Sequence, residues 1–344
     1  MRSRDRRTIN DKQTDMTKKR ILSGMRPTGR LHLGHLVGAL DNWVRLQEEY
    51  DCYFMVADWH AYMSEYENTA DLGEFIVDNV IDWLSAGIDP DKSTLFIQSE
   101  VPAHLDLHMI FSCITPLGLL ERCPTYKEQL REIKTRDLHT YGFLGYPVLQ
   151  AADILVYKAD KVPVGEDQLP HLELTREIAR RFNNLYKKEV FPSPEAILTK
   201  TSRLMGLDGR KMSKSYNNTI NLSDSEETVR HKVSSMFTDP KRIKLSDKGH
   251  PNSCNVFSYY GVFIPEMKEE VHDWCSNAKV GCTECKKRLS QGLLEKLKPF
   301  HQRRHEFSQD KNKVKKILEK GREKANAFTS GVLKEVREVV KLSI

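Results

Sequence analysis

The spacing of hydrophobic positions changes near residue 220 of this 344-residue chain. Before that point, apolar runs of strand length at residues 21–25, 53–57 and 94–97 alternate with stretches of helical spacing such as 72–84. Strands that alternate with helices in this way form parallel sheets with crossover helices. We therefore predict an α/β fold, a Rossmann-type doubly wound parallel sheet, over residues 20–217.

The remaining part of the chain has helical spacing and is rich in Lys and Glu. The string Ser223-Asp224-Ser225-Glu226 has the pattern of a capping box and predicts a helix that runs toward Phe237. Further helical patterns cover residues 289–297, 314–320 and 333–340. We predict a C-terminal all-helical domain at 218–344. Residues 1–19 are polar and basic without apolar periodicity, and we predict a disordered arm there.

Composition narrows the class of protein. No run approaches the ~20 apolar residues that span a bilayer, and the start of the chain lacks the pattern of a secretory signal. We therefore expect a cytoplasmic protein without membrane contact. A net charge of +6 suits a polyanionic partner such as RNA, although an ordinary basic enzyme would carry the same charge.

Two polar strings about 180 residues apart carry the most specific chemistry. His32-Leu33-Gly34-His35 follows the first predicted strand, and Lys211-Met212-Ser213-Lys214-Ser215 follows a glycine-containing segment. Two imidazoles three residues apart at a helix start can reach one phosphate, and a glycine between them lets a flat base approach the backbone. Lysines are compact cations that can hold phosphates. Either string alone also fits a solvated helix face or a metal pair, so the two must be weighed together.

In this order and spacing, the two strings resemble the paired signatures of class I aminoacyl-tRNA synthetases. Residues 146–155 (YPVLQAADIL) resemble the specificity helix of the tryptophanyl and tyrosyl enzymes, and residues 162–168 (VPVGEDQ) are similar to both families. Residues 20–220 as a whole, including the string ADWHA at 57–61, are more similar to the tryptophanyl enzymes. The resemblance implies a homodimeric ligase that uses ATP and Mg²⁺ to activate L-tryptophan and transfers it to tRNA(Trp).

The resemblance also implies roles for individual residues. Catalysis would fall to His32, His35, Lys211 and Lys214. The residues implied to contact ATP are Arg26, Pro27, Thr28, Gly34, His35, Gly165, Glu166, Asp167, Leu204, Lys211, Met212, Ser213, Lys214 and Ser215. Tyr146 and Gln168 would bind the α-ammonium group of tryptophan, whereas Asp153 and Gln150 would face its side chain.

The chemistry of Asp153 suits an indole, because an indole N–H only donates and a carboxylate only accepts. An Asp inside an apolar run is also costly to bury unless it has a partner. Two departures keep tyrosine open as the substrate: His35 replaces a frequent Asn, and Gln150, whose amide can bind a phenol, replaces a frequent Met. A nucleotidyltransferase with the same H-x-G-H pair and an inactive RNA-binding relative are further alternatives.

Four of the seven cysteines are clustered in the predicted helical domain: Cys254, Cys275, Cys282 and Cys285. Clustered thiols in a reducing compartment indicate a metal site, either zinc or an iron–sulfur cluster. A subset of the tryptophanyl enzymes that this chain resembles implies a [4Fe–4S] cluster here, with Zn²⁺ as the alternative, and implies that residues 218–344 form the anticodon-recognition domain. The neighbouring basic residues Lys279, Lys286, Lys287 and Arg288 would then face RNA. The other three cysteines, Cys52, Cys113 and Cys123, are predicted to be core thiols.

Overall fold

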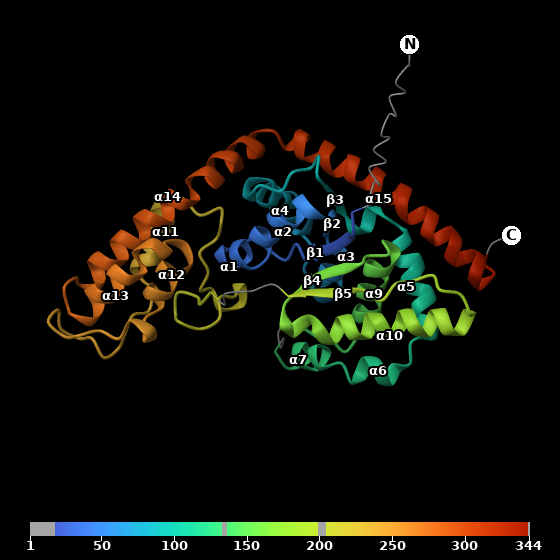
Figure 1. Cartoon of the computed structure of the whole chain (residues 1–344), viewed down its shortest axis with the longest axis horizontal. Coiled ribbons are helices and arrows are strands. Elements are labelled where there is room, and N and C mark those ends of the chain that lie inside the picture. Colours follow the sequence, from blue (N-terminus) through green and yellow to red (C-terminus); the bar gives the residue numbers. More distant parts are fainter. Residues whose placement is uncertain (1–17, 133–135, 199–203, 343–344) are drawn as a thin grey trace, which may run out of the picture.

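The computed structural model describes residues 18–132, 136–198 and 204–342 of the chain (Figure 1). The predicted N-terminal arm lies outside the described residues, apart from Lys18 and Lys19.

A parallel sheet with the strand order β3-β2-β1-β4-β5 forms the centre of the described structure. The strands are β1 (Arg20–Met25), β2 (Asp51–Val56), β3 (Ser93–Ile97), β4 (Lys161–Val164) and β5 (Glu195–Leu198). The order reverses between β1 and β4, and in such sheets ligands bind beyond the carboxyl ends of the strands at this point. The predicted doubly wound fold is therefore confirmed.

Both faces of the sheet are buried, because neighbouring residues of each central strand pack into different cores. Ile21 and Phe54 belong to one hydrophobic core, whereas Leu22 and Tyr53 belong to the other. The first core includes side chains of α2 (Asp41–Glu49) and α4 (Leu72–Ala86). The second includes α5 (Ala103–Ile114), α9 (Tyr146–Val156) and α10 (Leu169–Tyr186). Shorter helices follow the strands or lie at the periphery: α1 (Leu33–His35), α3 (Asp58–Glu65), α6 (Leu117–Glu121), α7 (Pro124–Glu132) and α8 (Tyr141–Leu144).

The C-terminal region is helical, as predicted. Its helices are α11 (Glu226–Ser234), α12 (Asn255–Phe263), α13 (Lys268–Ser276), α14 (Cys282–Gln309) and α15 (Lys311–Val340). Helix α11 begins two residues later than the sequence pattern suggests, since Ser225 and not Ser223 caps it by accepting the Thr228 N–H. The three separate helical patterns beyond residue 288 belong to two long helices, which form an arc along one side of the molecule (Figure 1).

The last helix returns to the sheet. Gly321 of α15 lies so close to β3 that a Cβ atom there would be 1.7 Å from the Leu95 carbonyl oxygen. Arg304 near the end of α14 donates to Asp82 of α4 at 2.7 Å and also pairs with Asp78. The segment after residue 300 is thus anchored on the α/β region, whereas α11 to α13 form a separate helical lobe at one end of the arc (Figure 1).

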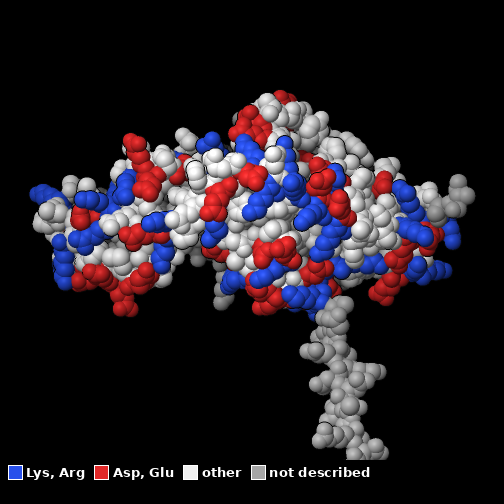
Figure 2. Space-filling model, turned by 90° about the horizontal axis from the view of Figure 1, so that it is seen from above, with Lys and Arg blue, Asp and Glu red and all other residues white. Residues whose placement is uncertain are grey.

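Charge is mixed on the outer face of this arc. Figure 2 shows Lys and Arg side chains interspersed with Asp and Glu over the face seen from above, without a broad basic patch. Among the described residues, no helix is both long enough and apolar enough to cross a membrane.

Candidate active site

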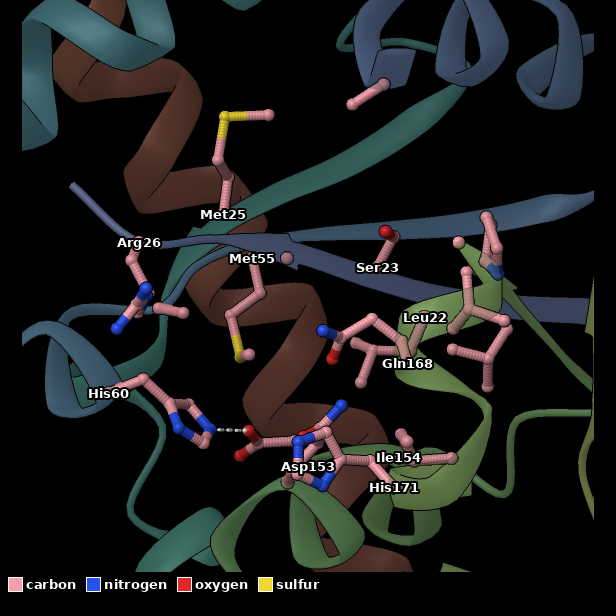
Figure 3. A pocket seen from close by; sticks show the side chains of 18 of the residues that line it. Leu22, Ser23, Met25, Arg26, Met55, His60, Asp153, Ile154, Gln168 and His171 are labelled. Carbon is pink, nitrogen blue, oxygen red and sulfur yellow. Dashed lines mark hydrogen bonds and ion pairs between the residues drawn. The ribbon is translucent and has the colours of Figure 1, made fainter. Parts of the chain in front are cut away.

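A cavity of about 620 Å³ opens beside β1 and β4 and collects residues from both predicted binding sets (Figure 3). The predicted residues that line it are Arg26, Gly34, His35, Tyr146, Gln150, Asp153, Gly165, Asp167 and Gln168. The other predicted residues do not line it. These are Pro27, Thr28, His32, Glu166, Leu204 and the string from Lys211 to Ser215, where nothing is described of the Ser215 side chain. Strings far apart in the sequence therefore converge on one cavity.

Backbone N–H groups of the first string fix the tautomer of its two histidines. The Nδ1 atom of His32 accepts the Gly34 N–H at 3.1 Å, and Nδ1 of His35 accepts the His32 N–H at 3.1 Å. Burial, together with the charge of Lys214, lowers the pKa of His32 to about 4, and burial lowers the pKa of His35 well below its usual value. Because both Nδ1 atoms accept, each neutral ring carries its hydrogen on Nε2 and can donate it.

Gly34 has a steric role between these rings. A Cβ atom at this position would lie 3.0 Å from the His32 ring. The side chain of Met212 also lies near this position, with its Sδ atom 3.7 Å from that point. The first and second strings therefore meet at Gly34.

The second string lies over the turn that follows β1. Lys214 is half-buried, and its Nζ donates to the Gly29 carbonyl at 2.9 Å. Burial, with the nearby charge of Arg26, lowers the pKa of Lys214 to about 8. Asn218 supports the loop, because its Oδ1 accepts the Ser213 N–H at 2.9 Å and its Nδ2 donates to the Lys211 carbonyl at 3.1 Å. Lys211 itself projects an exposed side chain.

Asp153 also lines the cavity and is held by three side chains. Its Oδ1 is within 2.8 Å of the Gln98 amide nitrogen and 2.7 Å of His104 Nδ1. Its Oδ2 is 2.8 Å from Nε2 of His60, the contact drawn in Figure 3. Burial opposes ionisation of this carboxyl, but the hydrogen bonds from His104 and His60 outweigh burial and hold its pKa well below the usual range. Asp153 is therefore an ionised acceptor.

The two residues expected to meet an amino group have neighbours of their own. Tyr146 Oη lies 3.2 Å from His171 Nε2, and the Gln168 amide donates to Asp167 at 3.2 Å. Gln150 lines the same cavity from α9.

The comparisons with known proteins agree with this geometry. The family model for class I tRNA synthetases of the tryptophan and tyrosine type matches residues 14–298. A tryptophan–tRNA ligase of Thermotoga maritima is 50% identical, over 94% of this chain and 99% of its own length. The chain belongs to the class I tryptophanyl-tRNA synthetases. A second such ligase, from Ralstonia nicotianae, is 41% identical over 95% of this chain and 100% of its own.

Solved structures place the synthetase in the same group. The crystal structure of tryptophanyl-tRNA synthetase from Campylobacter jejuni complexed with ADP and tryptophan superposes with a TM-score of 0.86. It is 33% identical and covers 94% of this chain and 99% of its own. A tyrosyl-tRNA synthetase from Archaeoglobus fulgidus, at 22% identity and a TM-score of 0.65, shares the fold.

Sequence reasoning gave no role to several polar residues of the site: His60, Gln98, His104 and His171. Two of them could have been found from the sequence. Gln98 directly follows β3, and His60 lies three residues after Ala57, the first residue beyond β2. The same strand-end rule that located the first string applies to them. His104 and His171 lie within helices, and no local pattern distinguishes them from core histidines.

The four clustered cysteines also come together in the synthetase. Cys254, Cys275, Cys282 and Cys285 line one small cavity between α12, α13 and the first turn of α14. No group of three or more His, Cys, Asp or Glu side chains in the described parts of the chain is arranged to hold a metal ion. Burial and the neighbouring cysteines raise the pKa of Cys285 to about 12.

The remaining cysteines fit their prediction only in part. Cys52 and Cys123 are buried, as expected of core thiols. The prediction was wrong for Cys113, which is exposed on α5. The apolar residues around it in the sequence include Met109, which is 62% exposed, so the local pattern marks an uncovered face of α5 and not the core.

Proposed function

We propose that this synthetase binds ATP and L-tryptophan at opposite ends of the cavity, forms tryptophanyl-adenylate, and transfers the amino acid to tRNA(Trp) in protein synthesis. The observation that carries the proposal is the joint lining of one cavity by His35 and Gly34 and by Asp153 and Tyr146. Attack of a carboxylate on the α-phosphate requires both substrates to be held together.

The phosphate end would stabilise the charge that moves onto pyrophosphate as it leaves. His32 and His35 are neutral Nε2–H donors, and Lys214 supplies a positive charge from the loop above them. Lys211 is exposed and would reach the phosphates from the same loop. Arg26, Pro27 and Thr28 would shape this end, with Leu204, Met212, Ser213 and Ser215 beside them. Gly165, Glu166 and Asp167 would meet the adenosine.

Magnesium would enter with the nucleotide. The described residues contain no acidic cluster arranged to hold a metal ion. Mg²⁺ keeps several waters and commonly binds substrate phosphates, so the phosphates of ATP would be its main ligands. Its contribution would be to neutralise charge on the phosphates.

The other end would select tryptophan. Asp153 is ionised, and its Oδ1 is held by Gln98 and His104. Its Oδ2 is hydrogen-bonded to His60 alone among the described residues. Oδ2 is therefore the oxygen suited to the indole N–H. Tyr146 and Gln168 would take the α-ammonium group, with Gln150 beside the ring.

Pyrophosphate exchange measured with each of the twenty amino acids tests the whole assignment. Tryptophan should give the highest rate, whereas a higher rate with tyrosine would overturn the assignment and would make Gln150 a phenol ligand.

We infer further that the four cysteines hold a metal group, for which a [4Fe–4S] cluster is the better fit and Zn²⁺ the alternative. The donor set is four thiols around one cavity, which is the ligand set of such clusters. The group would fix the fold of the helical lobe next to the region that we expect to read tRNA.

The support for RNA contact near this lobe is uneven. Lys279 is paired with Asp273 at 2.6 Å, and Arg288 with Glu284 at 2.9 Å. Lys286 donates to the Ser234 carbonyl at 2.9 Å. These three basic residues already have partners, so Lys287 is the strongest candidate of the four for a phosphate contact.

A homodimer and a cytoplasmic location complete the proposal. Leu105, Met109 and Cys113 are exposed at intervals of four residues on α5, and Leu117 is 61% exposed just beyond it. A second copy of the chain would cover this face, since an apolar stripe of this kind commonly marks an interface. Met109→Asp should convert the dimer to a monomer in light scattering, whereas the exposed control Met109→Leu should not.

A further inference from the structure

A chain of buried polar groups extends from the amino-acid end of the cavity into the protein. It begins at the Tyr146 hydroxyl, passes 3.2 Å to Nε2 of His171, and continues 3.6 Å from Nδ1 of that ring to the Cys123 thiol. The thiol in turn donates toward the Thr125 hydroxyl at 4.0 Å. All four residues are at least nine-tenths buried, and the two rings meet edge to face at 5.3 Å.

The direction of these hydrogen bonds depends on the tautomer of His171. Burial, with the charge of nearby His60, lowers the pKa of His171 to about 4, so the ring is neutral near pH 7 and has one donor and one acceptor. Burial raises the pKa of Tyr146 far above the working range, so the phenol keeps its hydrogen. If the thiol hydrogen points toward the Thr125 hydroxyl, 4.0 Å away, the sulfur accepts from Nδ1–H. Nε2 is then the acceptor, and the Tyr146 O–H donates to it.

This direction matters for the substrate. An ammonium group only donates hydrogen bonds, so it needs an oxygen whose own hydrogen points elsewhere. We propose that His171 is a positioning residue that turns the Tyr146 hydrogen away from the cavity, so that the phenol oxygen presents a lone pair to the α-ammonium group of tryptophan, and that Cys123 and Thr125 fix the ring tautomer. The inference rests on the proposed role of Tyr146 in the amino-acid site.

Two ligands separate this role from a general structural one. L-tryptophan carries the α-ammonium group, whereas indole-3-propionate has the same ring and a carboxylate but no amino group. Calorimetry on the full-length protein would give the dissociation constants of both for the parent, Tyr146→Phe, His171→Leu and the double variant. His171→Gln is the conservative variant, because its amide oxygen can accept from the phenol.

The expected result is a selective loss. Tyr146→Phe and His171→Leu should each weaken tryptophan binding roughly tenfold or more, as expected for a hydrogen bond to a charged group. Both should leave indole-3-propionate within about twofold of the parent. The double variant should be no weaker than Tyr146→Phe, since the two residues act as one unit. His171→Gln should recover most of the loss.

Other outcomes point to different errors. Equal weakening of both ligands by His171→Leu and His171→Gln would show a packing role and overturn the inference, as would additive effects in the double variant. A normal affinity for tryptophan in Tyr146→Phe would remove the proposed role of Tyr146 and the inference with it. A parent that binds tyrosine in place of tryptophan would contradict the proposed function itself.

Discussion

The active-site cavity and the four-cysteine cavity of this synthetase are assembled in different ways. The active-site cavity draws residues from Leu22 to His171, and its key groups already have partners, such as the three donors around Asp153. The four-cysteine cavity draws on a short stretch near Cys254 to Cys285, where burial and the neighbouring thiols raise the pKa of Cys275 and of Cys285. The first site is organised before its ligands arrive, whereas the metal group that we propose for the second would supply the positive charge that balances its thiolates.

The largest expected effect is on metal binding at the four-cysteine cavity. We expect that removal of one thiol abolishes binding of the metal group. Anaerobically purified parent should be brown, absorb broadly near ~400 nm and hold about four irons per chain. Cys282→Ser should lose the colour and loosen the lobe near residues 254–285, because metal binding contributes to the folding of such regions. Pyrophosphate exchange should survive better than tRNA charging.

The exposed Cys113 offers a matched control for this test. Cys113→Ser removes a thiol outside the cluster and should leave both iron content and absorbance unchanged. One tightly held zinc in colourless parent protein would replace the iron assignment and keep the four-cysteine site. Four freely titratable thiols in native, metal-free protein would remove the site.

The phosphate end should show the largest kinetic effect. Lys214→Ala or His35→Ala should slow adenylate formation about a hundredfold, because each contact strengthens as charge moves onto the leaving pyrophosphate and such a contact contributes ~3 kcal/mol. Tryptophan affinity should change little. Lys320→Ala, an exposed lysine on α15, is the control. An exchange kcat within about threefold of the parent in both variants would contradict the phosphate roles.

The sequence predicts features that depend on local patterns and misses those that depend on contacts between distant residues. The first three strands and the place of the first string after β1 were predictable, because strand–helix alternation and the strand-end rule act over short distances. Asp153, which lies inside α9, stood out for another reason, since a carboxylate within an apolar run needs a partner. His104 and His171 were not predictable, because their roles depend on contacts with residues 49 and 25 positions away. The cysteine spacing indicated a cluster, but the return of α15 to β3 depends on a close backbone approach at Gly321 that no periodicity reveals.

Specificity gives a smaller expected effect at the other end of the active-site cavity. Asp153→Asn replaces an acceptor by an amide that also donates, among three side chains already directed at it. A hydrogen bond to a charged group contributes ~1.5–3 kcal/mol, so kcat/KM for tryptophan should fall at least about tenfold. KM for ATP should stay near the parent value. An equal loss for both substrates in steady-state exchange would show that Asp153 supports the fold and does not select the side chain.

The smallest effect concerns pH and applies to the active-site cavity alone. Lys214 has a pKa of about 8 in the free enzyme, and only its protonated form attracts phosphate. Between pH 7 and 9 the cationic fraction falls about tenfold, so kcat/KM for ATP should fall by the same factor. Bound phosphates favour the cation and raise this pKa, so kcat should stay nearly flat over the range. Lys214→Arg should move the fall in kcat/KM to higher pH, because a guanidinium stays charged. If kcat/KM falls at the same pH in Lys214→Arg, the titrating group is not Lys214. Absorbance of the four-cysteine site should not change over this pH range.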